Sequence, residues 1–161
     1  MSKVLLSIVV IISSLFFSSI CSAEIEPSRC AIGGIRIGST KEHVQSIYGK
    51  PTSVQHYYWI YGKSFTIGFN DRTNACLEVF SNGNNGLATP DGVKVGMDAS
   101  ILRKTYGAED LAAKDYDSND DVKVYYVPGV KQPEMLVFWV KEGKITTMGC
   151  FYRDRHVPWG K

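Results

Sequence analysis

Two sixteen-residue segments of the chain match each other without a gap, and this repeat is the feature that most constrains the fold. Residues 34–49 read GIRIGSTKEHVQSIYG, and residues 92–107 read GVKVGMDASILRKTYG. The copies share their glycines and a Tyr-Gly pair, and an apolar-basic-apolar triplet follows the first glycine of each. Agreement in both spacing and chemical type indicates an internal duplication.

Each copy carries the signals of one short helix. Ser39-Thr40-Lys41-Glu42 has the hydroxyl and the glutamate of a capping box, and Asp98 can cap the second helix. Gly49 and Gly107 stand where a residue with positive φ ends a helix. We therefore expect one short helix in each copy.

Three segments rich in aromatic and β-branched residues follow each expected helix, separated by turn residues. These segments are 54–61, 64–70 and 75–81 in the first copy, and 121–127, 134–140 and 144–152 in the second. They predict an α+β fold in which two tandem helix-plus-three-stranded antiparallel meander repeats form a two-layer α/β sandwich. The loop 81–92 marks the boundary, so the repeats are 24–87 and 88–161, the second with a C-terminal tail.

The first residues are typical of a secretory signal peptide. Lys3 precedes an apolar run over 4–20, and small residues follow at 21–23. The alternative is a membrane anchor, but the run barely reaches the roughly 20 residues that a span needs. We expect a signal peptide over 1–23, no membrane span after cleavage, and an extracytoplasmic protein, periplasmic or secreted from a bacterial envelope.

Cys30, Cys76 and Cys150 are the cysteines that follow the expected cleavage point. An oxidising compartment favours one disulfide and one odd thiol among them. Cys30–Cys76 is the preferred pair because it lies within one repeat, although the other pairings stay open.

The chain offers few groups for catalysis or cofactor binding. His43, His56 and His156 are not spaced as metal ligands, and no nucleophile or phosphate-binding motif is present. The net charge is only +2, and the basic residues form no stripe along the sequence. Both observations argue against a nucleic-acid partner. We expect a protein that is not an enzyme and has no cofactor and no metal.

The aromatic residues indicate more about function than the few candidate catalytic groups do. Strand alternation places Tyr57, Trp59 and Tyr61 on one face of residues 57–61, with Tyr58 and Ile60 in the core beneath the first helix. In the second repeat, the same alternation buries Leu136, Phe138 and Val140 and turns Val137 and Trp139 outward.

Tyr and Trp dominate binding hot spots, so Tyr57, Trp59, Tyr61 and Trp139 are the candidate protein-binding residues. The alternative is that these aromatic residues pack the two repeats together.

The repeat unit resembles a known module. The segments IRIGSTKEHVQSIYGKP (35–51), YYWIY (57–61) and FTIGFN (65–70) are similar to the SmpA/OmlA outer-membrane assembly (BamE-like) domain. Two such units in one exported chain resemble the β-lactamase-inhibitor-protein architecture. This resemblance implies a non-enzymatic module that uses a sheet face or loops to bind another protein.

We therefore expect an exported protein-binding module, an inhibitor or a periplasmic scaffold, whose partner is another extracytoplasmic protein. The alternative is a structural factor in outer-membrane or cell-envelope assembly, and a weaker one is a cysteine-dependent redox protein. The sequence sets no oligomeric state.

Overall fold

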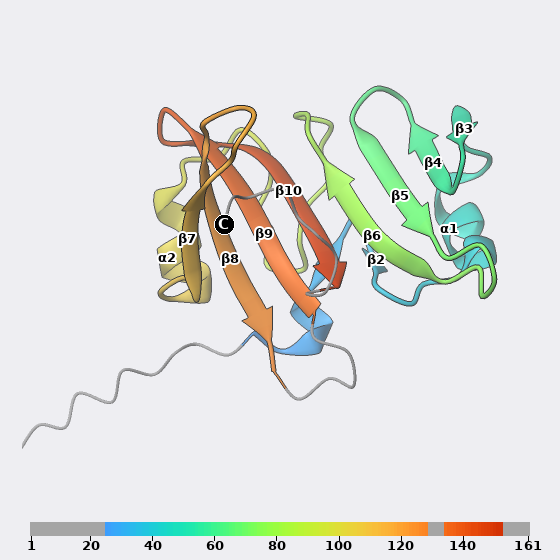
Figure 1. Ribbon diagram of the computed structural model, residues 1–161, viewed down its shortest axis with the longest axis horizontal. Coiled ribbons are helices and arrows are strands. Elements are labelled where there is room, and N and C mark those ends of the chain that lie inside the picture. Colours follow the sequence, from blue (N-terminus) through green and yellow to red (C-terminus); the bar gives the residue numbers. More distant parts are fainter. Residues whose placement is uncertain (1–24, 129–133, 153–161) are drawn as a thin grey trace, which may run out of the picture.

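An eight-stranded antiparallel sheet runs through the whole of the protein in the computed structural model, which describes residues 25–128 and 134–152 (Figure 1). Its strands are β3 (Ser53–Gln55), β4 (Tyr58–Tyr61), β5 (Phe65–Phe69), β6 (Cys76–Ser81), β7 (Leu111–Lys114), β8 (Asp121–Val127), β9 (Glu134–Lys141) and β10 (Lys144–Tyr152). The strand order is β3-β4-β5-β6-β10-β9-β8-β7. The first and second halves of the chain therefore meet where β6 pairs with β10.

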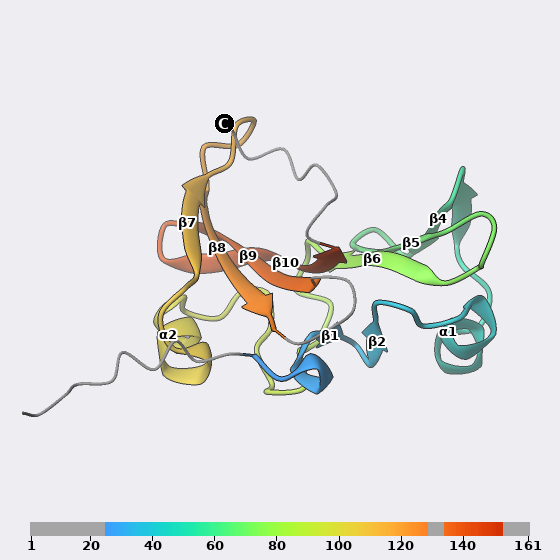
Figure 2. The ribbon, with the colours of Figure 1, turned by 60° about the horizontal axis from the view of Figure 1, so that its bottom comes forward.

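The remaining elements lie on one side of this sheet. They are the 3₁₀ helix η1 (Pro27–Arg29), the hairpin of β1 (Ala31–Ile32) and β2 (Ile35–Arg36), and the helices α1 (Lys41–Tyr48) and α2 (Ser100–Tyr106). Figure 2 shows α1 and α2 near opposite ends of the sheet, with the β1–β2 hairpin between them on the same side. We call this side the inner face and the opposite side the outer face.

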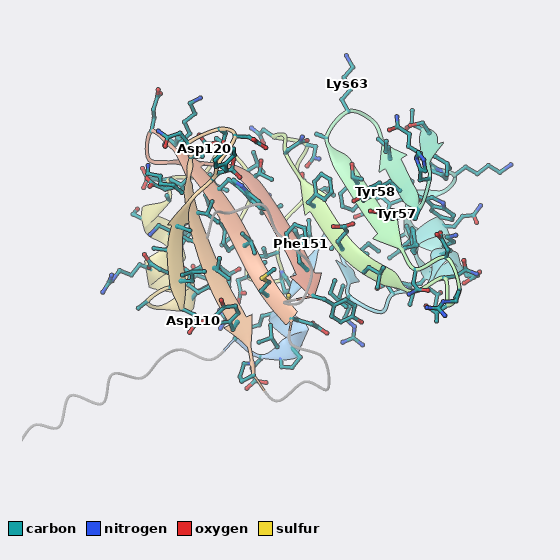
Figure 3. The ribbon with its side chains drawn as sticks, in the orientation of Figure 1. Tyr57, Tyr58, Lys63, Asp110, Asp120 and Phe151 are labelled. Atoms are coloured by element: carbon teal, nitrogen blue, oxygen red, sulfur yellow. The ribbon has the colours of Figure 1, made fainter. Side chains whose placement is uncertain are left out.

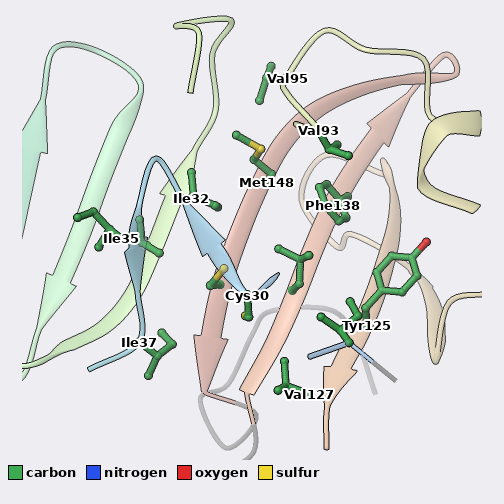
Figure 4. Packing of buried hydrophobic residues seen from close by; sticks show 14 of the residues in the cluster. Cys30, Ile32, Ile35, Ile37, Val93, Val95, Tyr125, Val127, Phe138 and Met148 are labelled. Atoms are coloured by element: carbon green, nitrogen blue, oxygen red, sulfur yellow. The ribbon is translucent and has the colours of Figure 1, made fainter. Parts of the chain in front are cut away.

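The hairpin fills the space between the helices. Ile32 and Ile35 are opposite each other in the β1–β2 pair, both are fully buried, and β1 packs against β6 and β10 (Figure 4). Burying each such side chain stabilises the fold by about 1.5–3 kcal/mol. The hairpin therefore occupies the position over the middle of the sheet that a helix would take in an α/β sandwich.

Arg29 connects the N-terminal segment to α2. Its Nε donates to the carboxylate of Asp91 at 3.0 Å and its Nη2 to the carbonyl of Thr105 at 3.0 Å. Its guanidinium also lies 5.1 Å from the centre of the Tyr106 ring. These contacts hold η1 beside the C-terminal end of α2.

The two predicted helices are present, but each N-cap, Thr40 in α1 and Ala99 in α2, lies one residue after the expected one. Thr40 rather than Ser39 is the N-cap of α1, because its Oγ1 accepts from the amide of His43 at 3.2 Å. The carboxylate of Asp98 accepts from the amide of Ser100 at 2.9 Å at the start of α2. Gly49 ends α1 with a φ of 71°, as its position in the sequence indicated.

The expected fold class, two tandem helix-plus-three-stranded meander repeats in a two-layer α/β sandwich, is wrong. The protein is mostly β, and eight of the ten strands in the described residues form one continuous sheet. A helix of eight residues is only about 12 Å long, whereas a sheet of eight strands is roughly 34 Å wide. Two such helices are therefore too small to cover the sheet as a complete layer. The hairpin and the connecting loops cover the rest of the inner face.

The strand boundaries differ from the expected ones in two places. The segment 54–61 is divided into β3 and β4, because His56 takes a positive φ of 53° in a turn between them. The strand β7 was not expected, and its sequence LAAK lacks the β-branched and aromatic residues that mark the others. β3 and β7 are the edge strands of the sheet.

The expected signal peptide and the C-terminal tail from Arg153 onward, which includes His156, lie outside the described residues. Within the described ranges, no helix is long and apolar enough to cross a membrane.

Because the inner core continues across the β6–β10 pair, we expect the protein to unfold in one cooperative transition. Leu136→Ala, at a fully buried position in β9, should lower the free energy of unfolding by about 3 kcal/mol. The matched change Leu111→Ala, on the exposed edge strand β7, should lower it by less than about 1 kcal/mol. Urea unfolding followed by circular dichroism and tryptophan fluorescence measures both. Two separate transitions, or equal losses in the two variants, would contradict this account.

Candidate functional site

The strand β4 presents its aromatic side chains to the opposite faces from those expected. Tyr61 pairs with Phe65 across the β4–β5 turn, and residues directly opposite each other share a face of the sheet. Trp59 and Tyr61 therefore pack against the inner core, with the Trp59 ring 5.0 Å from that of Phe69. The expected inner position of Tyr58 is wrong, because a shift of one residue in a strand moves every side chain to the other face of the sheet.

The four predicted binding residues consequently do not form one surface. Trp59 and Tyr61 belong to the inner face, whereas Tyr57 lies beside Tyr58, with ring centres 4.3 Å apart. Trp139 is on the outer face of the second half, where its Nε1 donates to Asp115 at 2.9 Å. The structure thus separates the predicted set into an inner pair and two distant outer positions.

In β9 the expected alternation is confirmed. Leu136, Phe138 and Val140 are buried in the inner core, and Val137 and Trp139 are on the other face. That face carries a second hydrophobic cluster, formed by Val122, Val124, Met135, Val137 and Phe151 with Phe80, Ala113, Tyr126 and Trp139 packed against it. The aromatic residues of the second half are therefore already used in packing.

A different group of residues forms the candidate site on the outer face of the first half. Tyr58, Gly68 and Glu78 are paired in one row across β4, β5 and β6, and Phe151 of β10 continues the row. Tyr57 stands at the start of β4 beside Tyr58, and Figure 3 shows both on the face turned away from the helices. We call Tyr57, Tyr58, Gly68 and Glu78 the tyrosine–glutamate site.

Gly68 allows this site to be compact. A Cβ at this position would lie 2.7 Å from Cγ and Oε1 of Glu78 and 3.0 Å from Cε1 of Tyr58. The glutamate and the tyrosine ring therefore both extend over the backbone of β5, where any other residue would push them away. The row holds its geometry because its middle member has no side chain.

A chain of hydrogen bonds links the polar atoms of the site. The Tyr57 hydroxyl donates to the Tyr58 hydroxyl at 3.1 Å, and the Tyr58 hydroxyl is hydrogen-bonded to the Glu78 carboxylate. Burial, followed by the hydrogen bonds to Tyr57 and Glu78, raises the pKa of Tyr58 above its ordinary value. Tyr58 therefore stays a neutral donor to the carboxylate over the physiological pH range.

Glu78 is the charged member of the site and is only 7% exposed. Among the described outward-facing residues of β4, β5 and β6, it is the one that carries a formal charge. A hollow of about 260 Å³ adjoins Tyr57 and is lined also by Asn70, Asp71 and Arg72 of the β5–β6 turn. The site thus combines two partly exposed tyrosine side chains and a carboxylate next to a small depression.

A larger cleft of about 560 Å³ lies on another part of the molecule, at the N-terminus of α1. Arg36, His43 and Glu134 line it, and burial raises the pKa of Glu134 while the nearby Arg36 opposes the shift. The hydroxyls of Ser39 and Thr40, also in its lining, already accept hydrogen bonds from the amides of Arg36 and His43. These hydroxyls serve the turn and the helix cap.

Cys30, Cys76 and Cys150 are buried free thiols, so the expected Cys30–Cys76 disulfide is not formed in this structure. Burial raises the pKa of Cys76 to about 12. The thiolate is the reactive form of cysteine, so Cys76 is a poor nucleophile while the protein is folded. Within the described residues, no group of three His, Cys, Asp or Glu side chains is placed to hold a metal ion.

No family model and no curated protein matches the sequence. Among solved structures, the chain is similar in fold to a DUF4309 family protein, YjgB, from Bacillus subtilis subsp. subtilis str. 168. The TM-score is 0.51 at 14% sequence identity, over 74% of this chain and 83% of that one.

It is also similar to an extracellular protein containing an SCP domain from Bacillus anthracis str. Ames, with a TM-score of 0.52 at 11% identity. That match covers 77% of this chain and 47% of that one, so the chain spans about half the length of this neighbour. Similarity at these identities concerns the fold alone. The resemblance to the BamE-like and β-lactamase-inhibitor-protein families stays a prediction.

The buried tyrosines make the stability of the protein sensitive to alkaline pH. Burial raises the pKa of Tyr58, Tyr106 and Tyr125 in the folded state above the value near 10 of an unfolded chain. Above about pH 10 the unfolded chain loses protons that the folded protein keeps, so the free energy of unfolding should fall as the pH rises.

Tyr58→Phe removes one of these groups and should make the fall between about pH 9 and about pH 11 less steep. Urea unfolding at a series of pH values measures the slopes. Identical slopes for wild type and variant would show that Tyr58 ionises normally in the folded protein.

Proposed function

We propose that the protein is an exported, non-enzymatic module that binds another extracytoplasmic protein through the tyrosine–glutamate site. The observation that carries this proposal is Glu78, a carboxylate that is 7% exposed on a sheet face made of tyrosine and glycine. Partly exposed tyrosine rings next to a small depression are typical of sites that hold a partner's side chain.

The chemistry of the site favours a positively charged side chain of the partner. The faces of the Tyr57 and Tyr58 rings attract cations, and the carboxylate of Glu78 supplies the opposite charge. A charge kept at a largely buried position is stabilised when a group of opposite sign approaches it. We therefore infer that the partner presents an arginine or a lysine to this site.

Export is supported by two observations. The signal-peptide pattern at 1–23 predicts secretion, and one of the two structural neighbours is described as an extracellular protein. A binding role also agrees with the low reactivity of Cys76, which argues against the redox alternative.

The proposal is tested by capturing a partner from an extracytoplasmic extract of the source organism with the mature protein as bait. Tyr57→Ala should lower the affinity for that partner at least about 10-fold, because it removes a partly exposed ring from the site. Tyr116→Ala is the matched control, since Tyr116 is 83% exposed in the turn between β7 and β8, and should leave binding unchanged. Equal binding by the wild type and both variants would exclude this face. Recovery of the protein with membranes alone would favour the envelope-assembly alternative.

The charge preference is tested separately with Glu78→Gln, which keeps the shape and the hydrogen-bond acceptor for Tyr58. We expect about a 10-fold loss of affinity and a weaker dependence on salt concentration. Glu42→Gln removes the same charge from the exposed surface of α1 and should change neither quantity. Titration calorimetry at two ionic strengths measures both. If the two variants behave alike, bulk charge rather than the site decides the interaction.

A further inference from the structure

The strand β10 ends beside the tyrosine–glutamate site. Phe151 is the partner of Glu78 in the β6–β10 pair, and Tyr152 is the last residue of β10. Phe151 belongs to the hydrophobic cluster of the outer face, whereas Tyr152 packs against the inner core. The chain therefore continues into the C-terminal tail from a point one residue past the neighbour of Glu78.

The tail is basic where it leaves the strand. Residues 153–161 read RDRHVPWGK, in which Arg153, Arg155 and Lys161 outnumber the single acid Asp154. Alternate residues of an extended chain share a face, so Arg153 and Arg155 have the same parity as Phe151, which is outward. Two residues of a strand span roughly 7 Å, so Arg153 begins only that far along the chain from the neighbour of Glu78.

The surface next to the end of β10 has the opposite charge. β10 is antiparallel to β6, so a chain that continues past Tyr152 in the direction of β10 runs toward the β5–β6 turn. The hollow that adjoins the site lies there and is lined by Leu77, Asp71 and Arg72, among others. Together the site and the hollow present the carboxylates of Glu78 and Asp71 against the single guanidinium of Arg72. The basic start of the tail therefore complements this surface.

We propose that residues 153–155 of the chain's own tail dock on the tyrosine–glutamate site, with the guanidinium of Arg153 at the carboxylate of Glu78. The tail then holds the position that the partner's basic side chain takes, an inference that rests on the proposed binding function. A tethered group acts at an effective concentration on the order of millimolar, so even a weak contact competes with a partner in solution. The tail thus regulates the site, and a partner binds only by displacing it.

Digestion with trypsin tests the docking without any partner, because trypsin must take the arginine that precedes the cut bond into its own pocket. The exported full chain is digested under native conditions, and the peptides released from the tail are followed by mass spectrometry. Cleavage after Arg153 should be at least about 5-fold slower in the wild type than in Glu78→Gln, which lacks the opposite charge. Glu42→Gln, on the exposed surface of α1, should be cleaved like the wild type. High salt should speed the cleavage of the wild type.

Nuclear magnetic resonance of the labelled wild type gives a second measurement, which decides the question even if Glu78→Gln fails to fold. We expect nuclear Overhauser contacts from the Arg153 side chain to the ring of Tyr58 and to the Cα protons of Gly68. Absence of these contacts, or equal cleavage of the wild type and a folded Glu78→Gln, would overturn the proposal. Protection of the tail that disappears on dilution would also overturn it, because a second copy would then supply the tail.

The regulatory part is tested with the partner captured from the extracytoplasmic extract. The double variant Arg153→Gln/Arg155→Gln should bind that partner at least about 3-fold more tightly than the wild type, because its tail no longer competes. Lys161→Gln removes the same charge from the far end of the tail and should bind like the wild type. Equal affinities of the double variant and the wild type would overturn the competition. If no partner is captured, the proposed function fails, while the cleavage and the resonance contacts still decide whether the tail docks.

Discussion

The pairing of β6 with β10 is the interaction on which the rest of the structure depends. Val79 faces Cys150 and Glu78 faces Phe151 across this pair, so it joins the last strand of the first half to the last strand of the second. Each strand would otherwise expose a row of unpaired backbone groups in the middle of the protein, which is costly when buried. With the pair formed, the sheet is continuous and the β1–β2 hairpin has a surface on which to pack.

The outer face shows how this pairing bears on function. The row from Tyr58 through Gly68 and Glu78 reaches Phe151, which already belongs to the second hydrophobic cluster. The tyrosine–glutamate site is therefore bordered by side chains of both halves, although its own members come from the first half. A site built on paired strands is held more rigidly than one built on loops.

Two residues of the tyrosine–glutamate site are unusual for their places in the sequence. Glu78 is the single charged residue in the strand ACLEVFS, and Gly68 interrupts the apolar strand SFTIGFN. A buried charge and a strand glycine each suggest a special role, but neither reveals that they are neighbours. The short turn after Tyr61 also sets Tyr61 opposite Phe65, which was enough to place Trp59 and Tyr61 on the face of Phe65.

The sequence by itself determined that each copy holds one short helix, that these helices end at Gly49 and Gly107, and where most of the strands run. Positive-φ glycines and side-chain alternation are local properties, and Gly49, Gly107 and the alternation of β9 show them plainly. Only the tertiary structure decided that β6 pairs with β10, that β3 and β7 extend the sheet, and that Cys30, Cys76 and Cys150 are buried in one cluster. These outcomes depend on contacts between residues far apart in the chain, whose free energies no short stretch of sequence contains.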